Sequence, residues 1–193
     1  HVLPEEVHTE GITSVTEADV KYAAACGGVI KLVGRATRTE DGHLFCLVSP
    51  VILPSDNLLA DVNDVFNGIM VRGDSVGDVV FVGRGAGKLP TASAVVADII
   101  DIVAHRGSSE RAPKFAVATP ADYADFAAYR TKHCFAFAEC EGAEEQIKAV
   151  FGEIKTVRVA GRVACVTEEL SETEATKKAA ATGLSLVSRI RML

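Results

Sequence analysis

The residues with the clearest chemical potential lie in the stretch GRGAGKLPTASA at 83–94. Its glycines at 83, 85 and 87 follow the apolar run DVVFVG and precede the amphipathic run PTASAVVADIIDIVAHR. A glycine-rich turn between a strand and a helix can direct backbone N–H groups at an anion such as a phosphate. Lys88 follows the turn directly and could face the same anion.

Two familiar phosphate-binding loops do not fit this stretch. A Walker A loop needs a hydroxyl residue after its lysine, but Leu89 follows Lys88, and the glycine spacing also differs. A dinucleotide fingerprint needs Gly-x-Gly-x-x-Gly, whereas the third glycine here comes one residue too early. Two interpretations therefore stay open: the loop contacts a phosphate or cofactor, or it is a tight turn that packs a helix against a strand.

Other catalytic chemistry has little support in the sequence. The five histidines (1, 8, 43, 105 and 133) form no pair with metal-ligand spacing, so we expect no metal site. The nucleophile elbow Gly-x-Ser-x-Gly does not occur. Lys31 lies in an apolar, strand-like run, where it is either an active-site ammonium or an ordinary edge lysine.

Composition narrows the class of protein. The 193 residues are 48% hydrophobic and 24% charged, which is typical of globular domains with a buried core. The net charge of −6 and the lack of a basic, aromatic-rich stretch argue against nucleic acid as partner. No run of 18 apolar residues could cross a membrane. The five cysteines form no CxxC pair, which favours free thiols in a reducing compartment and a cytoplasmic location.

The first half reads as a short helix, strands and a longer helix. TEAD at 16–19 predicts a capping box for a helix that ends at Gly27-Gly28. Strand-like runs between 28 and 83 predict one mostly antiparallel sheet. From Pro90 onward, apolar residues at helical spacing predict a helix with one buried stripe, formed by residues 92, 95, 96, 99 and 103.

The second half has a different pattern. The polar stretch RGSSERAP (106–113) marks a candidate boundary. From residue 131 the order strand, helix, strand, strand, helix, strand fits the ferredoxin-like βαββαβ plan. We therefore expect an α+β protein with domains at 1–107 and 131–193, joined by a linker at 108–130.

Three segments resemble homoserine dehydrogenase. They are EGITSVTEADVKYA (10–23), the dense match from Val48 to Ile102, which includes the specific pattern GRGAGKLPTASAVVADI, and the terminal VTEELSETEATKKA…VSRIRML. The resemblance implies an oxidoreductase that reduces L-aspartate 4-semialdehyde to L-homoserine with NADPH or NADH, for threonine and methionine biosynthesis. It implies that residues 1–107 end the catalytic and dimerisation domain, and that 131–193 form an ACT regulatory domain.

The resemblance also implies where the site residues lie. The catalytic residues are expected upstream of His1, so this chain alone is expected to be inactive. The GAG loop passes beside the dinucleotide in the family, with Gly87 at the contact position and Gly85 and Lys88 as weaker candidates. The strands between 28 and 83 are expected to build a homo-oligomer, either a dimer or a tetramer.

ACT domains often bind an amino acid where the first strand turns into the first helix. The family pattern there is Asp-x-Pro-Gly, and this chain has Glu139-Cys140-Glu141-Gly142, followed by Ala143. Free N–H groups at the helix start could hold the carboxylate of threonine, which makes Glu139, Gly142 and Ala143 candidate effector residues. The acidic side chains nearby would repel that carboxylate. One alternative is an ACT fold kept for dimerisation only, and another is a stand-alone amino-acid-binding or dimerisation module without catalysis.

Overall fold

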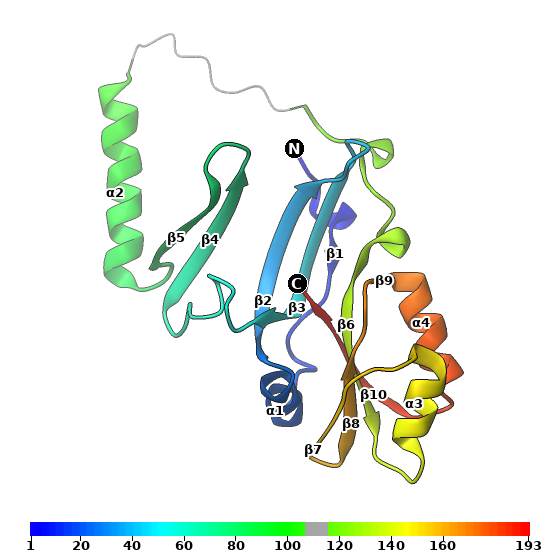
Figure 1. Ribbon diagram of the computed structural model, residues 1–193. Coiled ribbons are helices and arrows are strands. Elements are labelled where there is room, and N and C mark those ends of the chain that lie inside the picture. The colour runs from blue at the N-terminus through cyan, green and yellow to red at the C-terminus, as the bar shows by residue number, and fades with distance from the viewer. Residues whose placement is uncertain (107–115) are drawn as a thin grey trace. The chain divides into compact units, whose positions relative to one another are not determined.

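The computed structural model describes residues 1–106 and 116–193 (Figure 1). The chain forms two compact units. The first combines His1–Ser55 with Ala116–Leu193, and the second is Asp56–Phe115, described as far as Arg106. None of the helices in the described ranges is long and apolar enough to cross a membrane.

The first unit is built on a mixed eight-stranded sheet. Its main order is β1-β3-β10-β6-β8-β7, while β2 pairs with the other edge of β3 and the short β9 pairs with β6. The strands are β1 (His8–Thr9), β2 (Gly28–Arg38), β3 (Leu44–Pro54), β6 (Arg130–Ala138), β7 (Thr156–Val159), β8 (Arg162–Val166), β9 (Leu170–Ser171) and β10 (Leu186–Met192).

One junction joins the two halves of the sequence. β10 runs parallel to β3, with Arg191 opposite Val51 and Met192 opposite Ile52. Val51 and Ile52 are fully buried, so the strand that carries them needs neighbours along both edges. The compact units therefore differ from the expected division at 107 and 131, because residues on either side of that division share one sheet.

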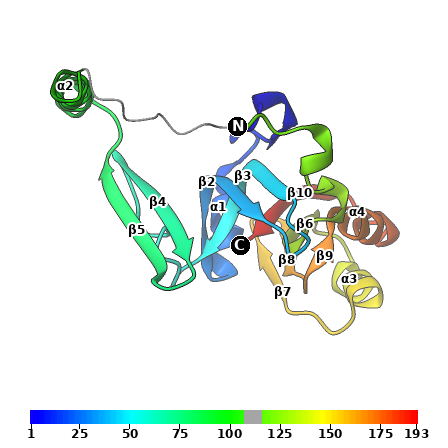
Figure 2. The ribbon, with the colours of Figure 1, turned by 90° about the horizontal axis from the view of Figure 1, so that it is seen from above.

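The helices of this unit cover both faces of the sheet. α3 (Ala143–Phe151) and α4 (Glu172–Ala181) lie side by side over Phe135 and Phe137 (Figure 2). α1 (Glu17–Ala25) packs through Tyr22 on the opposite face, in a cluster that includes the intervening Cys134 and Ala136. Alternate residues of one strand thus fill two cores, as the pleat of a strand requires.

The predicted helix starts are confirmed. Thr16 and Asp19 form the capping box of α1, and Ser171 and Glu174 form that of α4, with each side chain bonded to the other residue's backbone N–H. Gly27 follows α1 with φ +83°, a left-handed conformation that favours glycine.

The segment expected as a linker is partly structured. Residues 107–115, which hold most of the predicted boundary at 106–113, lie outside the described residues. Residues 116–130 contain two short 3-10 turns, Pro120–Asp122 and Phe126–Ala128. The ring of Phe126 stacks on His8 at 3.6 Å, and Tyr129 stacks on Phe45 at 3.9 Å, so this segment is part of the first unit.

The second unit contains a hairpin and a long helix. β4 (Phe66–Gly73) and β5 (Gly77–Arg84) form a separate two-stranded antiparallel sheet, and α2 spans Lys88–Ala104. The expectation of a single sheet between 28 and 83 is therefore wrong for the described chain: β2 and β3 belong to the large sheet. The predicted buried stripe of α2 is also wrong, because every residue of the helix is at least partly exposed.

Candidate functional site

The glycine loop turns the chain from β5 into α2. Gly87 caps the helix with φ +112°, a conformation that side-chain-bearing residues rarely adopt, and its carbonyl accepts a hydrogen bond from Thr91 N at 3.1 Å. A Cβ at Gly85 would overlap the side-chain amide of Asn67 on β4. Both glycines are thus needed by the path of the chain itself, whatever the loop binds.

The loop nevertheless keeps the properties of an anion site. α2 is 17 residues long, and its N-terminus carries the positive end of the helix dipole. Lys88 is the first residue of the helix and is exposed. A cofactor contact at Gly87, Gly85 and Lys88 stays a prediction that this geometry allows.

The predicted effector turn lies between β6 and α3. Gly142 caps α3 in the left-handed conformation with φ +76°. Ala143 is fully buried in the core beneath the helix, and its N–H donates to Cys140 O at 3.3 Å. The side chain of Ala143 therefore cannot contact a ligand, so Ala143 could contribute only through its backbone.

Arg158 on β7 changes the charge of the effector turn. Its guanidinium bonds to Glu139 Oε1 at 2.9 Å and to Glu144 Oε1 at 2.6 Å. Its hydrogen bond holds the pKa of Glu144 below the ordinary value. The repulsion expected from the acidic residues is therefore reduced, although sequence reasoning missed this arginine because no local spacing links it to the turn.

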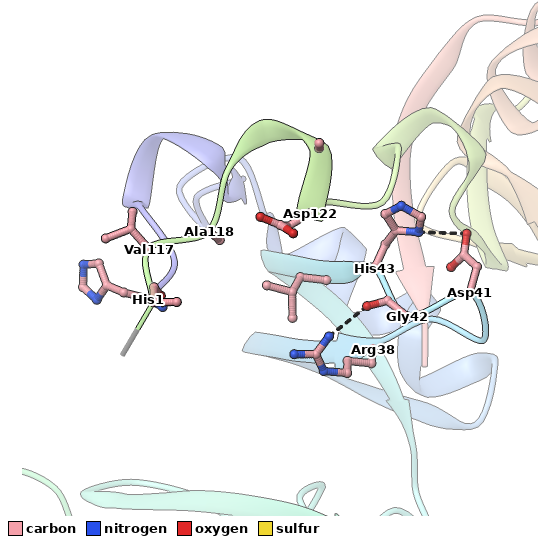
Figure 3. A pocket seen from close by; sticks show the side chains of 11 residues that line it. His1, Arg38, Asp41, Gly42, His43, Val117, Ala118 and Asp122 are labelled. Carbon is pink, nitrogen blue, oxygen red and sulfur yellow. Dashed lines mark hydrogen bonds and ion pairs between the residues drawn. The ribbon is translucent and has the colours of Figure 1, made fainter. Parts of the chain in front are cut away.

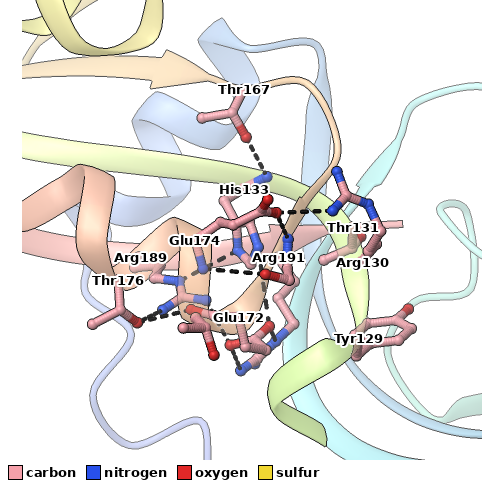
Figure 4. A network of polar contacts seen from close by, with 12 residues as sticks. Tyr129, Arg130, Thr131, His133, Thr167, Glu172, Glu174, Thr176, Arg189 and Arg191 are labelled. Atoms are coloured by element: carbon pink, nitrogen blue, oxygen red, sulfur yellow. Dashed lines mark hydrogen bonds and ion pairs between the residues drawn. The ribbon is translucent and has the colours of Figure 1, made fainter.

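A second polar cluster lies inside the first unit and was not predicted. Arg191 on β10 is almost fully buried and bonds to Glu172 Oε1 at 2.7 Å, to Glu10 Oε2 at 2.8 Å and to Ser49 Oγ at 3.0 Å (Figure 4). Arg189 bonds to the same Glu172. The charges come from three segments and the Ser49 hydroxyl from a fourth, so the cluster connects the N-terminal region with β3, β10 and α4.

His133 sits beside this cluster. Its Nδ1 accepts a hydrogen bond from Arg189 Nε at 3.3 Å. Its Nε2 is buried, lies 4.0 Å from Glu172 Oε1 and finds no hydrogen-bond partner among residues 1–106 and 116–193. Burial and the adjacent arginine cations lower the pKa of His133 to about 4. The imidazole is therefore neutral near neutral pH. The charged groups of this cluster bond to each other, so we interpret the cluster as a structural link between the segments that carry them.

A shallow cavity of about 340 Å³ lies beside the turn between β2 and β3 (Figure 3). Its polar groups are already engaged: Arg38 donates to Gly42 O at 2.9 Å, and His43 lies 2.9 Å from Asp41. We assign no ligand to it. Among residues 1–106 and 116–193, no three His, Cys, Asp or Glu side chains are arranged to hold a metal ion.

The sequence of this chain is similar to those of known enzymes. The sequence model described as "Homoserine dehydrogenase" matches residues 1–100. Curated homoserine dehydrogenases include one from Pseudomonas aeruginosa, 52% identical over 51% of this chain and 23% of its own length, and one from Synechocystis, 48% identical over 58% of this chain and 27% of its own. The matched half of the chain thus spans about a quarter of the length of these relatives.

Solved structures match over a wider range. A homoserine dehydrogenase from Thiobacillus denitrificans aligns with a TM-score of 0.78 and 31% identity, covering 98% of this chain and 48% of that one. The enzyme from S. aureus aligns with a TM-score of 0.74 and 25% identity over the same shares. The similarity therefore includes the second half of this chain, which the family model does not cover.

Proposed function

Because this chain belongs to the homoserine dehydrogenase family, we propose that it is part of an NAD(P)-dependent oxidoreductase that reduces L-aspartate 4-semialdehyde to L-homoserine. The observation that carries the proposal is the 52% identity to a homoserine dehydrogenase across about half the chain. The chain contributes the cofactor-facing loop, an oligomerisation surface and a regulatory module. Hydride transfer itself needs nicotinamide and substrate held together by groups that we place outside this sequence.

The glycine loop is the part nearest the chemistry in this proposal. The backbone at Gly85 and Gly87 carries no Cβ, so a dinucleotide can approach it closely. Lys88 supplies a cation at the start of α2 for a phosphate oxygen. When bound, the nicotinamide supplies the hydride, and this loop helps to hold the dinucleotide in place.

The hairpin of the second unit is suited to pairing with another copy. Ile69, Val71 and Phe81 lie on one face of it, and each is more than half exposed. Such contiguous apolar surface commonly marks an interface. We propose that this face forms the homo-oligomer, either a dimer or a tetramer.

The module from β6 to β10 has the strand order of a ferredoxin-like fold. Counting only its own strands, the order β10-β6-β8-β7 places the fourth strand beside the first and the third beside the second, all antiparallel. With two helices on one face, this supports an ACT-like regulatory role. The backbone at Glu139, Gly142 and Ala143 would receive the carboxylate of threonine, and the dimerisation-only role is the alternative.

The free thiols fit a cytoplasmic location. All five cysteines are unbridged, as expected in a reducing compartment.

The enzymatic proposal is tested with the full protein that contains this sequence. Adding NADPH and aspartate semialdehyde should give turnover, while the 193-residue chain alone should give none. Absence of turnover in the folded full protein would refute the enzyme and leave the second candidate, an amino-acid-binding or dimerising module. Threonine distinguishes the two roles of that module, because a ligand that binds only the folded state raises its melting temperature.

A further inference from the structure

The first unit has a cavity of about 700 Å³ that none of the functions above uses. It is lined by the end of α1, by parts of β2, β6 and β7, and by the last residues of β10. Its apolar lining includes Val157, Val166 and Met192. A space of this volume is large enough for a small metabolite.

Positive charge dominates the lining. Four cations line the cavity, Arg35, Arg130, Lys132 and Lys155, against the side chain of Glu169 and the terminal carboxylate of Leu193. The whole chain carries a net charge of −6, so its composition alone would not predict a cavity lined mostly by cations. Clefts lined by one sign of charge attract ligands of the opposite sign.

The cations differ in how far they are already paired. Arg130 is engaged by Glu174 at 2.8 Å and by Glu169 O at 2.7 Å. One guanidinium nitrogen of Arg35 donates a hydrogen bond to the Tyr129 hydroxyl at 3.1 Å. The other N–H groups of this guanidinium can still donate to a ligand. The side chains of Lys132 and Lys155 make no ion pair or hydrogen bond within the described part of the chain.

The pKa of the Cys26 thiol responds to the groups around it in the cavity. Its thiol is part of the lining and accepts a hydrogen bond from the Cys134 thiol at 3.8 Å. That bond, together with the positive charge of Lys155, lowers the pKa of Cys26, although burial opposes the shift. The Cys134 hydrogen bond is the larger of the two lowering effects, and Lys155 adds to it from the cavity lining.

We propose that this cavity binds a small polyanion, with its charges on phosphate or carboxylate groups held by Lys132, Lys155 and Arg35. The apolar side chains would contact the carbon skeleton. The site lies in the first unit, away from the glycine loop in sequence, and does not depend on the dehydrogenase activity.

Calorimetric titration of the 193-residue chain tests the proposal, with pyrophosphate and citrate as probes at constant ionic strength. We expect binding of at least one probe, weakened about tenfold in Lys132→Ala and in Lys155→Ala, the loss of one charged contact. Lys177→Ala, an exposed lysine on α4, is the matched control. If only pyrophosphate binds, the ligand carries phosphate groups, and if only citrate binds, it carries carboxylates. If both probes bind, the site selects its ligand by charge alone.

A second measurement uses the unsubstituted chain and does not rely on the variants folding. A bound probe should slow the reaction of Cys26 with iodoacetamide and leave exposed Cys140 unaffected, as read by peptide mass spectrometry. No binding at millimolar probe, or binding that both lysine variants retain in full, overturns the proposal. Equal protection of Cys26 and Cys140 overturns it as well.

Discussion

Arg191 holds Glu10 through two parallel hydrogen bonds of 2.8 Å, although 181 residues separate them in the sequence. The guanidinium also bonds to Glu172, and it is almost fully buried. Although burial raises the pKa of Glu10, the hydrogen bonds from Arg191 and His8 lower it to about 2. This pair connects the first strand of the sheet to the last.

Removing this arginine should destabilise the first unit strongly. Arg191→Ala leaves the buried Glu172 carboxylate with Arg189 as its remaining cation and removes both guanidinium bonds to Glu10, which costs about 3–5 kcal/mol of unfolding free energy. Urea unfolding followed by circular dichroism measures the change. Arg158→Ala is the control, since Arg158 also bonds two carboxylates but at an exposed position, and its unfolding midpoint should change little. Equal losses of unfolding free energy in the two variants would contradict the prediction that buried Arg191 stabilises the fold more than exposed Arg158.

Stability should fall as the pH is lowered from about 6.5 toward 4, through His133. The pKa of its imidazole is about 4 in the folded chain and 6.5 ordinarily, so the unfolded chain binds the additional proton in this window. The Glu10 contribution is lost at lower pH, between 4.5 and about 2. His133→Phe should flatten the dependence of the unfolding midpoint between pH 6.5 and 4.5. His105→Gln, at an exposed position, should leave it unchanged.

Cys26 should be alkylated before Cys134 and Cys165. Its pKa is lowered by the Cys134 thiol, whereas burial raises the pKa of Cys165 to about 12, and the pKa of Cys134 is raised by its bond to Cys26 and by burial. The thiolate is the reactive form. Timed labelling with iodoacetamide and peptide mapping give the order, and Cys134→Ala should slow the labelling of Cys26. Equal rates at all three positions would be inconsistent with this assignment.

Two glycines on β2 should respond oppositely to the same substitution. A Cβ at Gly28 would lie 2.5 Å from Ile52 Cγ2 and 2.7 Å from Leu53 O, so Gly28→Ala should cost about 1–3 kcal/mol. A Cβ at Gly34 would lie 3.9 Å from Val48 Cγ2, an ordinary contact. Gly34→Ala should therefore be neutral or slightly stabilising. Thermal melting of the two variants makes the comparison, which fails if their shifts agree.

Local patterns in the sequence predicted much of the fold. Capping boxes at Thr16 and Ser171, and the order of elements after residue 131, depend on neighbouring residues and were confirmed. The pairing of β3 with β10 could not be predicted, since it joins segments 140 residues apart that carry no matching signal. The stripe on α2 was correctly apolar, but periodicity does not say what covers it.

The candidate site was less predictable for the same reason. The glycine loop is a contiguous motif that can be recognised in the sequence, but its spacing left two interpretations open, and its cofactor contact, implied by the family resemblance, stays a prediction. Arg158, which neutralises the effector turn, and the charges around Arg191 meet only after folding. The cationic cavity is equally non-local, because Arg35, Lys132 and Lys155 come from three strands or their ends.

The position of β10 has a consequence for biosynthesis. This strand lies between β3 and β6, yet the ribosome makes it after every other strand of the sheet. Until it emerges, β3 and β6 each present an open edge, and the nascent chain holds two half-sheets that cannot close. Assembly of this unit thus waits for its last strand, and during that delay the exposed edges are the surfaces that a chaperone would need to shield.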